Sequence, residues 1–375
     1  MKVLFLRAGA SKGAGYPLAS ELLAEVGMYV ESSRMSGVRD EWARYLDFWK
    51  ATRGVSRRIL ESTNPEVVLT LLDLFAEARA TESQDFSSWL SRFGKTWDKS
   101  DRRNLKKARK RREKEPHEFA KVELARLGLQ RALDEYFWQK HAGNAEETAK
   151  ARRSYLEREL SDLAEGDVVI TTNWDSLVER VLLETRRLTP ADGFGFPVSL
   201  TVEPAASPLA VHVPRVSDVK VLKLHGSFGW YKRYGGIYLG ENHYFRYLFL
   251  NKDNSVLFFK DTSEPDLDPY PEAAFIYPSF IKQFVEPELR RVWAEASWAL
   301  AKCAEFRAVG YSLPESDVGV RTLLNPLSLR IRERAVSVIV EDPAGAVNKR
   351  WQALLGDDII LTGRSIGATT PESGC

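Results

Sequence analysis

Cysteine is scarce in this chain, which has 375 residues and only two cysteines, Cys303 and Cys375. Two thiols cannot build a disulfide framework or a four-cysteine zinc site. No regularly spaced carboxylates accompany the five histidines, so we expect no metal site. This cysteine usage favours a reducing cytoplasm.

Long hydrophobic runs and an excess of charge are also missing. No stretch reaches the roughly 18 apolar residues of a membrane span, and the apolar run at the N-terminus is too short for a signal peptide. Basic and acidic residues number 54 and 52, which gives no global attraction to nucleic acid or acidic membranes. We expect a soluble cytoplasmic protein of one to three domains with no membrane partner.

Short apolar runs predict a parallel sheet. The clearest is 168–171, which leads through the polar turn Thr172 to Asp175 into an amphipathic helix from Leu177. Further strands are expected at 2–6, 219–224, 306–309 and 335–340, with a small antiparallel excursion at 238–260. Strands that alternate with helices indicate an α/β fold with a doubly wound, mostly parallel, Rossmann-like sheet.

Residues 31–159 show helical periodicity almost without strand alternation, so we interpret them as a helical insertion. Residues 1–30 and 160–362 would then form the catalytic domain, and 363–375 a tail. Within the insertion, the run from Arg102 to Lys114 carries nine basic residues. Nucleic acid is one partner for such a run, but a solvated helix or loop is favoured because no aromatic residues are interleaved.

Each predicted strand ends in a glycine or a polar residue, and the carboxyl ends of parallel strands line one crevice where ligands bind. Two turn residues need weighing against structural roles. Asp175 is either a helix cap or, if Ser176 and Glu179 form a capping box, free to meet a ligand. His225 lies between a strand and a Gly-Ser turn, which favours a reactive group over core packing.

The motifs together resemble those of the sirtuin-like family. They are A-G-A-S-x-x-x-G-Y-P from Ala8, T-T-N-W-D from Thr171, K-L-H-G-S from Lys223 and G-Y-S-L-P-E-S-D from Gly310. The resemblance covers residues 1–30 and about 160–345. It is closest to the NAD-hydrolysing sirtuin-like proteins of bacterial anti-phage systems, and it implies a sirtuin-like fold.

The resemblance implies a role for each matching residue. Asn173 and His225 would be the catalytic pair, supported by Asp175 at the nicotinamide ribose. A water or ribose hydroxyl oriented by Asn173 could give its proton to His225, whose unperturbed pKa is about 6.5. The residues implied to bind NAD, the substrate, are Ala8, Gly9, Ala10, Ser11, Gly15, Pro17, Thr172, Gly310, Tyr311, Ser312, Asp317, Glu341 and Asp342.

Two departures from the family modify this expectation. Deacetylating members carry a four-cysteine zinc ribbon that two cysteines cannot build, which favours a hydrolase over a deacylase. Arg7 replaces the glycine that usually opens the phosphate loop. Its guanidinium would either contact the pyrophosphate or block it, and the second case is compatible with an enzyme that a partner or oligomer activates.

The leading hypothesis is therefore an NAD hydrolase that releases nicotinamide and ADP-ribose, an effector of abortive infection through NAD depletion. Its control would come from a homo-oligomer or a partner defence protein that contacts the helical insertion. The alternatives are an NAD-dependent deacylase or ADP-ribosyltransferase, and a catalytically silent subunit that binds NAD or ADP-ribose.

Overall fold

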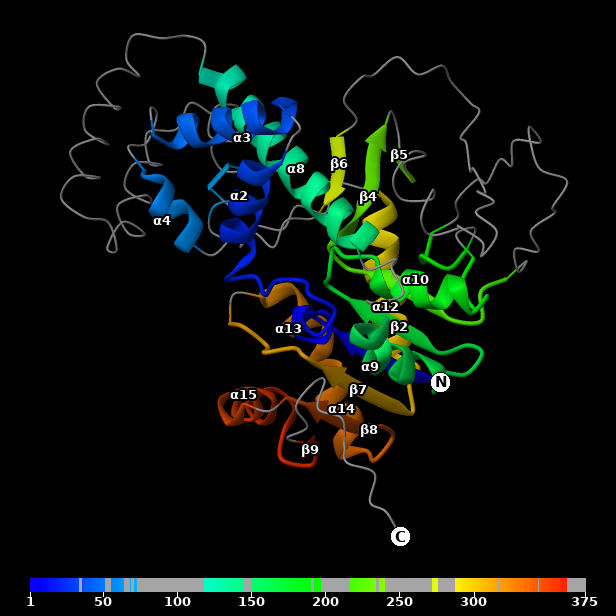
Figure 1. Ribbon diagram of the computed structural model, residues 1–375. Coiled ribbons are helices and arrows are strands. Elements are labelled where there is room, and N and C mark those ends of the chain that lie inside the picture. The colour runs from blue at the N-terminus through cyan, green and yellow to red at the C-terminus, as the bar shows by residue number, and fades with distance from the viewer. Residues whose placement is uncertain are drawn as a thin grey trace, which may run out of the picture. The chain divides into compact units, whose positions relative to one another are not determined.

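The computed structural model describes most of the predicted catalytic region and part of the helical block (Figure 1). The described residues are 1–33, 36–50, 55–63, 68, 71–72, 118–143, 150–189, 192–196, 216–233, 236–239, 272–275, 287–315, 317–342 and 344–362. The basic run from Arg102 to Lys114 and the predicted tail at 363–375 lie outside them. Within these ranges, no helix has the length and apolar content that crossing a bilayer requires.

The chain divides into two compact units. The first consists of Met1–Tyr16, Trp138–Ile276 and Lys282–Cys375, and the second of Pro17–Phe137 and Tyr277–Ile281. The main boundaries thus follow Tyr16 and Phe137, whereas the sequence-based boundaries follow residues 30 and 159. Helix α9 (Lys150–Ser161), assigned above to the insertion, belongs to the first unit.

The first unit contains a six-stranded sheet in the order β3-β2-β1-β7-β8-β9. Its strands are β1 (Lys2–Leu6), β2 (Val168–Thr171), β3 (Lys220–Lys223), β7 (Glu305–Val309), β8 (Ser337–Glu341) and β9 (Ile360–Thr362). All neighbouring pairs run parallel. The chain crosses from one half of the sheet to the other between β1 and β7, and this reversal of strand order is where ligands bind in doubly wound sheets. The predicted fold class is confirmed.

Burial explains why these short runs become inner strands. Every residue of β2 is buried, as are four of the five in β1, so apolar side chains cover both faces and no polar alternation remains. Strands β7 and β8 mix buried and half-buried positions, and Ser337 at the start of β8 is exposed. Strand β9 was not predicted, because three residues carry too little pattern to be recognised.

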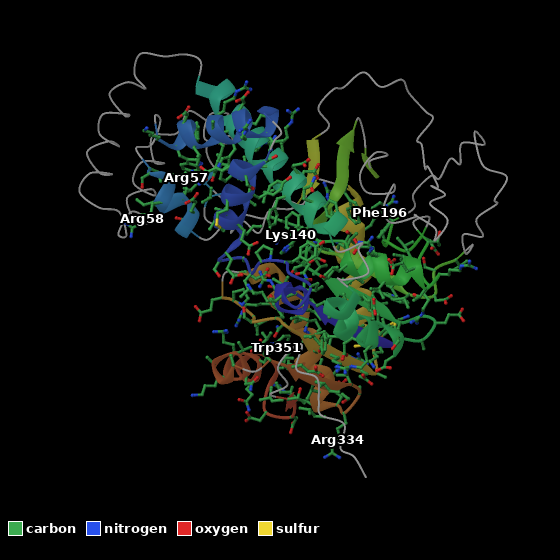
Figure 2. The ribbon with its side chains drawn as sticks, viewed as in Figure 1. Arg57, Arg58, Lys140, Phe196, Arg334 and Trp351 are labelled. Atoms are coloured by element: carbon green, nitrogen blue, oxygen red, sulfur yellow. The ribbon has the colours of Figure 1, made fainter. Side chains whose placement is uncertain are left out.

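Helices cover both faces of this sheet (Figure 1). Arg307 and Phe306 are neighbours on β7, so their side chains point to opposite faces. Arg307 pairs with Glu159 of α9, at 2.6 Å, while the Phe306 ring packs 6.2 Å from the ring of Trp351. Trp351, labelled in Figure 2, belongs to α15 (Gly345–Leu355). Helices α9 and α15 therefore lie on opposite faces. Among the described residues of this unit, further helices are α1 (Ala8–Lys12), α10 (Leu177–Glu184), α12 (Pro287–Lys302), α13 (Val318–Leu324) and α14 (Pro326–Arg332).

A second, antiparallel sheet has the order β5-β4-β6. It comprises β4 (Gly226–Arg233), β5 (Gly236–Leu239) and β6 (Glu272–Phe275). The antiparallel excursion expected at 238–260 falls mostly outside the described residues. The Gly-Ser pair after His225 is the start of β4 rather than the predicted turn. His225 thus occupies a two-residue corner between the two sheets.

The second unit is helical where it is described, as expected of the insertion. It contains α2 (Leu22–Ser32), α3 (Ser36–Phe48), α4 (Arg57–Ser62) and most of α8 (Glu118–Gly143). Aromatic side chains at helical spacing, Trp42, Tyr45 and Trp49, are buried together. Gly128 lets α8 approach α3 closely, because an added Cβ would lie 2.4 Å from the Glu41 carbonyl oxygen.

Candidate active site

Hydrogen bonds between its own polar groups hold the turn after β2 in place. The Asn173 N–H donates to Thr171 Oγ1 at 3.0 Å, and the Leu177 N–H donates to Asp175 Oδ1 at 3.1 Å. Helix α10 begins at Leu177 with Ser176 as N-cap but without a side-chain cap hydrogen bond. The expected capping box does not form. Asp175 partly caps the helix from the preceding position, and only 5% of the residue is exposed.

Ser11 connects the two functional side chains of this turn. Asn173 Nδ2 donates to Ser11 Oγ at 3.0 Å, and Ser11 Oγ donates to Asp175 Oδ2 at 2.8 Å. Because an ionised carboxylate only accepts, it orients the serine hydroxyl, and the hydroxyl oxygen in turn selects the nitrogen side of the Asn173 amide. The amide oxygen of Asn173 is then the atom directed away from Ser11. This relay brings together three predicted site residues from α1 and the turn after β2.

Asp175 is a buried carboxyl that accepts hydrogen bonds from two donors. Burial raises its pKa above the usual range, whereas the Lys223 ammonium and the Ser11 hydrogen bond act in the opposite direction. The carboxylate accepts from Ser11 and Leu177, both donors, as an ionised group requires. A buried carboxyl with a raised pKa at the carboxyl end of a strand is typical of a functional site.

His225 is fixed next to this turn by hydrogen bonds on both sides. The preceding residue, Leu224, donates its N–H to the Thr171 carbonyl at 2.8 Å, and its carbonyl accepts from Trp293 Nε1 at 2.8 Å. On the other side, the Phe228 N–H donates to the Trp174 carbonyl at 3.1 Å. His225 itself is 2% exposed. The corner that carries His225 and the turn that carries Asn173 are therefore held as one piece.

The carboxyl ends of β1 and β7 meet through two glycines. Gly310 has a φ of +65°, and a Cβ there would lie 2.4 Å from the Ala10 nitrogen. A Cβ on Gly9 would lie 2.8 Å from the Gly310 Cα. Only glycine fits at either position. Close backbone packing at the point where the strand order reverses thus accounts for both glycines, and their contact with NAD remains a prediction.

Arg7 follows β1 and turns toward β7. Its guanidinium lies over the ring of Tyr311, 4.8 Å from the centroid, and 3.9 Å from Asp317 Oδ2. The Tyr311 hydroxyl donates to the same Asp317 oxygen at 3.1 Å. Both partners are almost fully buried. Tyr311 and Asp317, both named in the sequence analysis, therefore hold the Arg7 guanidinium at the carboxyl ends of β1 and β7.

The turn after β8, which carries the predicted NAD-binding residues Glu341 and Asp342, makes contacts within the protein. Glu341 is 3% exposed and accepts from Arg307 Nε at 2.7 Å and from the Tyr155 hydroxyl at 3.1 Å. Burial, followed by the charges of Glu159 and Glu341, raises the pKa of Tyr155, so its hydroxyl stays protonated and donates. Asp342 Oδ1 accepts from the Ala344 N–H at 2.9 Å. These contacts give both carboxylates structural roles.

The other predicted contact residues occupy varied settings. Thr172 is 7% exposed, and its buried hydroxyl has no hydrogen-bond partner within the described ranges. The Ser312 carbonyl accepts from Arg350 Nε at 2.8 Å. Ala8 and Ala10 lie in α1, which forms where a loop was expected. Gly15 has a φ of +85°, and Pro17 is the first residue of the second compact unit.

Sequence reasoning missed the two most deeply buried charges near the turn, Lys223 and Glu179. Their side chains are 0% exposed and pair at 2.7 Å. The one available signal was a lysine in the apolar run before His225, which was quoted as part of a motif without a role. No group of metal-binding side chains occurs among the residues that the structure describes.

Comparison with known proteins finds one family that part of this chain resembles. Residues 167–353, just under half of the chain, match a family described as the SIR2-like domain. None of the curated proteins matches this chain.

Three solved structures are distantly similar. A mutant Sir2 homologue complex with 2′-O-acetyl ADP ribose has 11% identity and a TM-score of 0.38, covering 98% of this chain and 87% of that one. A Sir2 homologue complex with NAD has 14% identity and a TM-score of 0.35, covering 98% and 84%. A mutant Sir2 homologue complex with ADP ribose has 13% identity and a TM-score of 0.35, covering 98% and 87%.

Proposed function

We propose that this chain is an NAD hydrolase that cleaves the N-glycosidic bond of NAD to give nicotinamide and ADP-ribose. The observation that carries the proposal is the relay from Asn173 through Ser11 to Asp175, built beside the His225 corner at the carboxyl ends of the parallel strands. The match to the SIR2-like domain family supports NAD as the ligand.

The residue types suit the chemistry of this bond. When the bond between C1′ and the nicotinamide nitrogen breaks, its electron pair neutralises the pyridinium ring and the ribose carbon becomes electron-poor. A water then adds to C1′ and loses a proton. The oriented amide oxygen of Asn173 would hold that water, His225 would accept the proton, and the buried negative charge of Asp175 would favour the positive transition state.

The biological role follows from the resemblance described above. Hydrolysis of NAD depletes a central cofactor, so we propose an effector of anti-phage abortive infection. Such an enzyme needs restraint, and we propose control by a homo-oligomer or a partner defence protein through the helical insertion. Deletion of residues 35–137, which belong to the second compact unit, should change assembly and regulation; unchanged behaviour would refute this part.

A catalytically silent NAD- or ADP-ribose-binding subunit is the second candidate, and one observation favours it. Arg7 occupies the start of the phosphate loop with its guanidinium held by Tyr311 and Asp317. Under this reading the purified chain binds NAD without consuming it, and His225→Ala leaves function intact. A deacylase or ADP-ribosyltransferase would instead consume NAD only when an acceptor is supplied.

The test is NAD turnover by the purified chain, with products identified by chromatography and mass spectrometry. We expect nicotinamide and ADP-ribose from the wild type, and losses of about 10²-fold or more for Asn173→Ala and His225→Ala. Asn325→Ala is the matched control, because Asn325 is exposed and makes no side-chain cap hydrogen bond. NAD binding without turnover, alone and with candidate partners, would favour the silent subunit.

A further inference from the structure

Lys223 is a fully buried lysine that contacts the turn bearing Asn173 and Asp175. It is the last residue of β3, two positions before His225, and its side chain is 0% exposed. Its ammonium lies 2.7 Å from Oε1 of Glu179, a residue of α10. The Glu179 side chain is also 0% exposed. Lysine and glutamate are almost never fully buried unless paired, so this pair is built at a considerable desolvation cost.

The ammonium has a second partner in the catalytic turn. Lys223 Nζ donates to the main-chain carbonyl of Asp175 as well as to Glu179. One ammonium therefore joins three segments: the strand that leads to His225, the turn that carries Asn173, and the helix that follows the turn. No other described side chain makes hydrogen bonds to both the turn and α10 from β3.

Stability alone is a weak reason to keep such a pair. A buried ion pair replaced by apolar side chains of similar volume is often as stable or more stable. An apolar side chain at 223, however, could not hold the Asp175 carbonyl. It would also leave the Asp175 carboxylate without the positive charge that now compensates it.

We propose that Lys223 is a positioning residue of the active site, which fixes the turn bearing Asn173 and Asp175 relative to the His225 corner. The mechanistic part of this inference rests on the proposed NAD hydrolysis. The groups that face the Asp175 carboxylate are Lys223 from β3, Glu179 from α10, Ser11 from α1 and the Leu177 N–H. Lys223 is the one cation among them, so its removal raises the pKa of Asp175 further.

A double-mutant cycle separates positioning from stability. Lys223→Met alone leaves Glu179 buried without its partner, and we expect a clear fall in Tm. Adding Glu179→Gln removes that uncompensated charge, and we expect most of the Tm to return. Lys349→Met is the matched control, because Lys349 is exposed on α15. Each variant is assayed for Tm, for hydrogen exchange of peptides spanning 172–178, and for kcat and KM with NAD against pH.

In the double variant we expect Tm close to wild type but amide exchange in residues 172–178 faster by about tenfold or more. We also expect kcat lower by about 10- to 100-fold with KM changed less than about threefold, since small displacements of reacting groups cost this much. The acidic limb of the kcat profile should move to higher pH.

Recovery of exchange protection and kcat together with Tm would overturn the proposal and leave Lys223 a purely structural residue. If the wild type does not turn over NAD, the proposed hydrolase function fails by itself. The exchange comparison then decides whether Lys223 positions the turn, because it needs no activity.

Discussion

Substituting Asp175 by asparagine separates the function of this carboxylate from its effect on stability. The variant keeps the shape of the side chain and replaces the ionisable carboxyl of Asp175 by a neutral amide. The oppositely charged pair of Lys223 and Glu179 remains. The substitution also breaks the relay, because an amide that accepts from Leu177 must present its nitrogen to Ser11. The serine then loses its acceptor, and the Asn173 amide loses its orientation.

The stability effect is the difference between two opposing terms. Burial raises the pKa of Asp175, and each unit of that rise corresponds to about 1.4 kcal/mol by which the ionised group disfavours the folded state. Losing a hydrogen bond to a charged acceptor removes about 1.5–3 kcal/mol. We therefore expect the free energy of unfolding at pH 7 to change by less than about 2 kcal/mol, while NAD turnover falls by about 10²-fold.

The sign of the pH dependence follows from the raised pKa. Wild-type stability should be highest below the unfolded pKa of about 3.9 and should fall as pH rises toward the folded value. Asp175→Asn lacks this loss, so the difference in unfolding free energy should move in its favour from about pH 4 upward. Urea denaturation across pH 4–8, beside the turnover assay, measures both. Retained activity, or a pH-independent loss above about 3 kcal/mol, would refute the reasoning.

Three further substitutions test neighbouring parts of the site. Arg7→Ala removes the guanidinium held by Tyr311 and Asp317, and we expect KM for NAD to rise about tenfold with kcat nearly unchanged, as for loss of one charge-assisted contact; faster turnover would mean that Arg7 blocks the site. Gly310→Ala places a Cβ 2.4 Å from the Ala10 nitrogen at a φ of +65°, and denaturation should show a loss of about 3 kcal/mol or more. At Gly15, where φ is +85° and nothing lies within 4 Å of a Cβ, alanine should cost only about 1–2 kcal/mol; equal losses would contradict this account.

The inner strands could be predicted because their signal is local. Runs such as 168–171 are apolar on both faces, and the polar residues that end them follow directly in sequence. Because β1 and β2 are parallel neighbours, the segments that follow them lie at the same edge of the sheet. Ser11, Asn173 and Asp175 meet there through hydrogen bonds.

The pairing of charges could not be predicted because the partners are distant in sequence. Glu179 has the spacing of a capping box with Ser176, but a buried cation 44 residues away takes its carboxylate. Likewise, the pairing of Glu341 with Arg307 of the neighbouring strand had no signal in the sequence, and contact of Glu341 with a ligand stays a prediction. Helix α1 was expected as a loop because Gly9 within it and Gly13 and Gly15 after it masked a five-residue helical turn.

The central claim is that the relay from Asn173 to Asp175, beside His225, cleaves NAD. The most direct measurement is product-resolved NAD turnover by the purified chain beside Asn173→Ala, His225→Ala and the Asn325→Ala control. The account predicts nicotinamide and ADP-ribose from the wild type and the control, and losses of about 10²-fold or more from both site variants. Turnover that survives both site substitutions, or NAD binding without any turnover even with partners present, would contradict it.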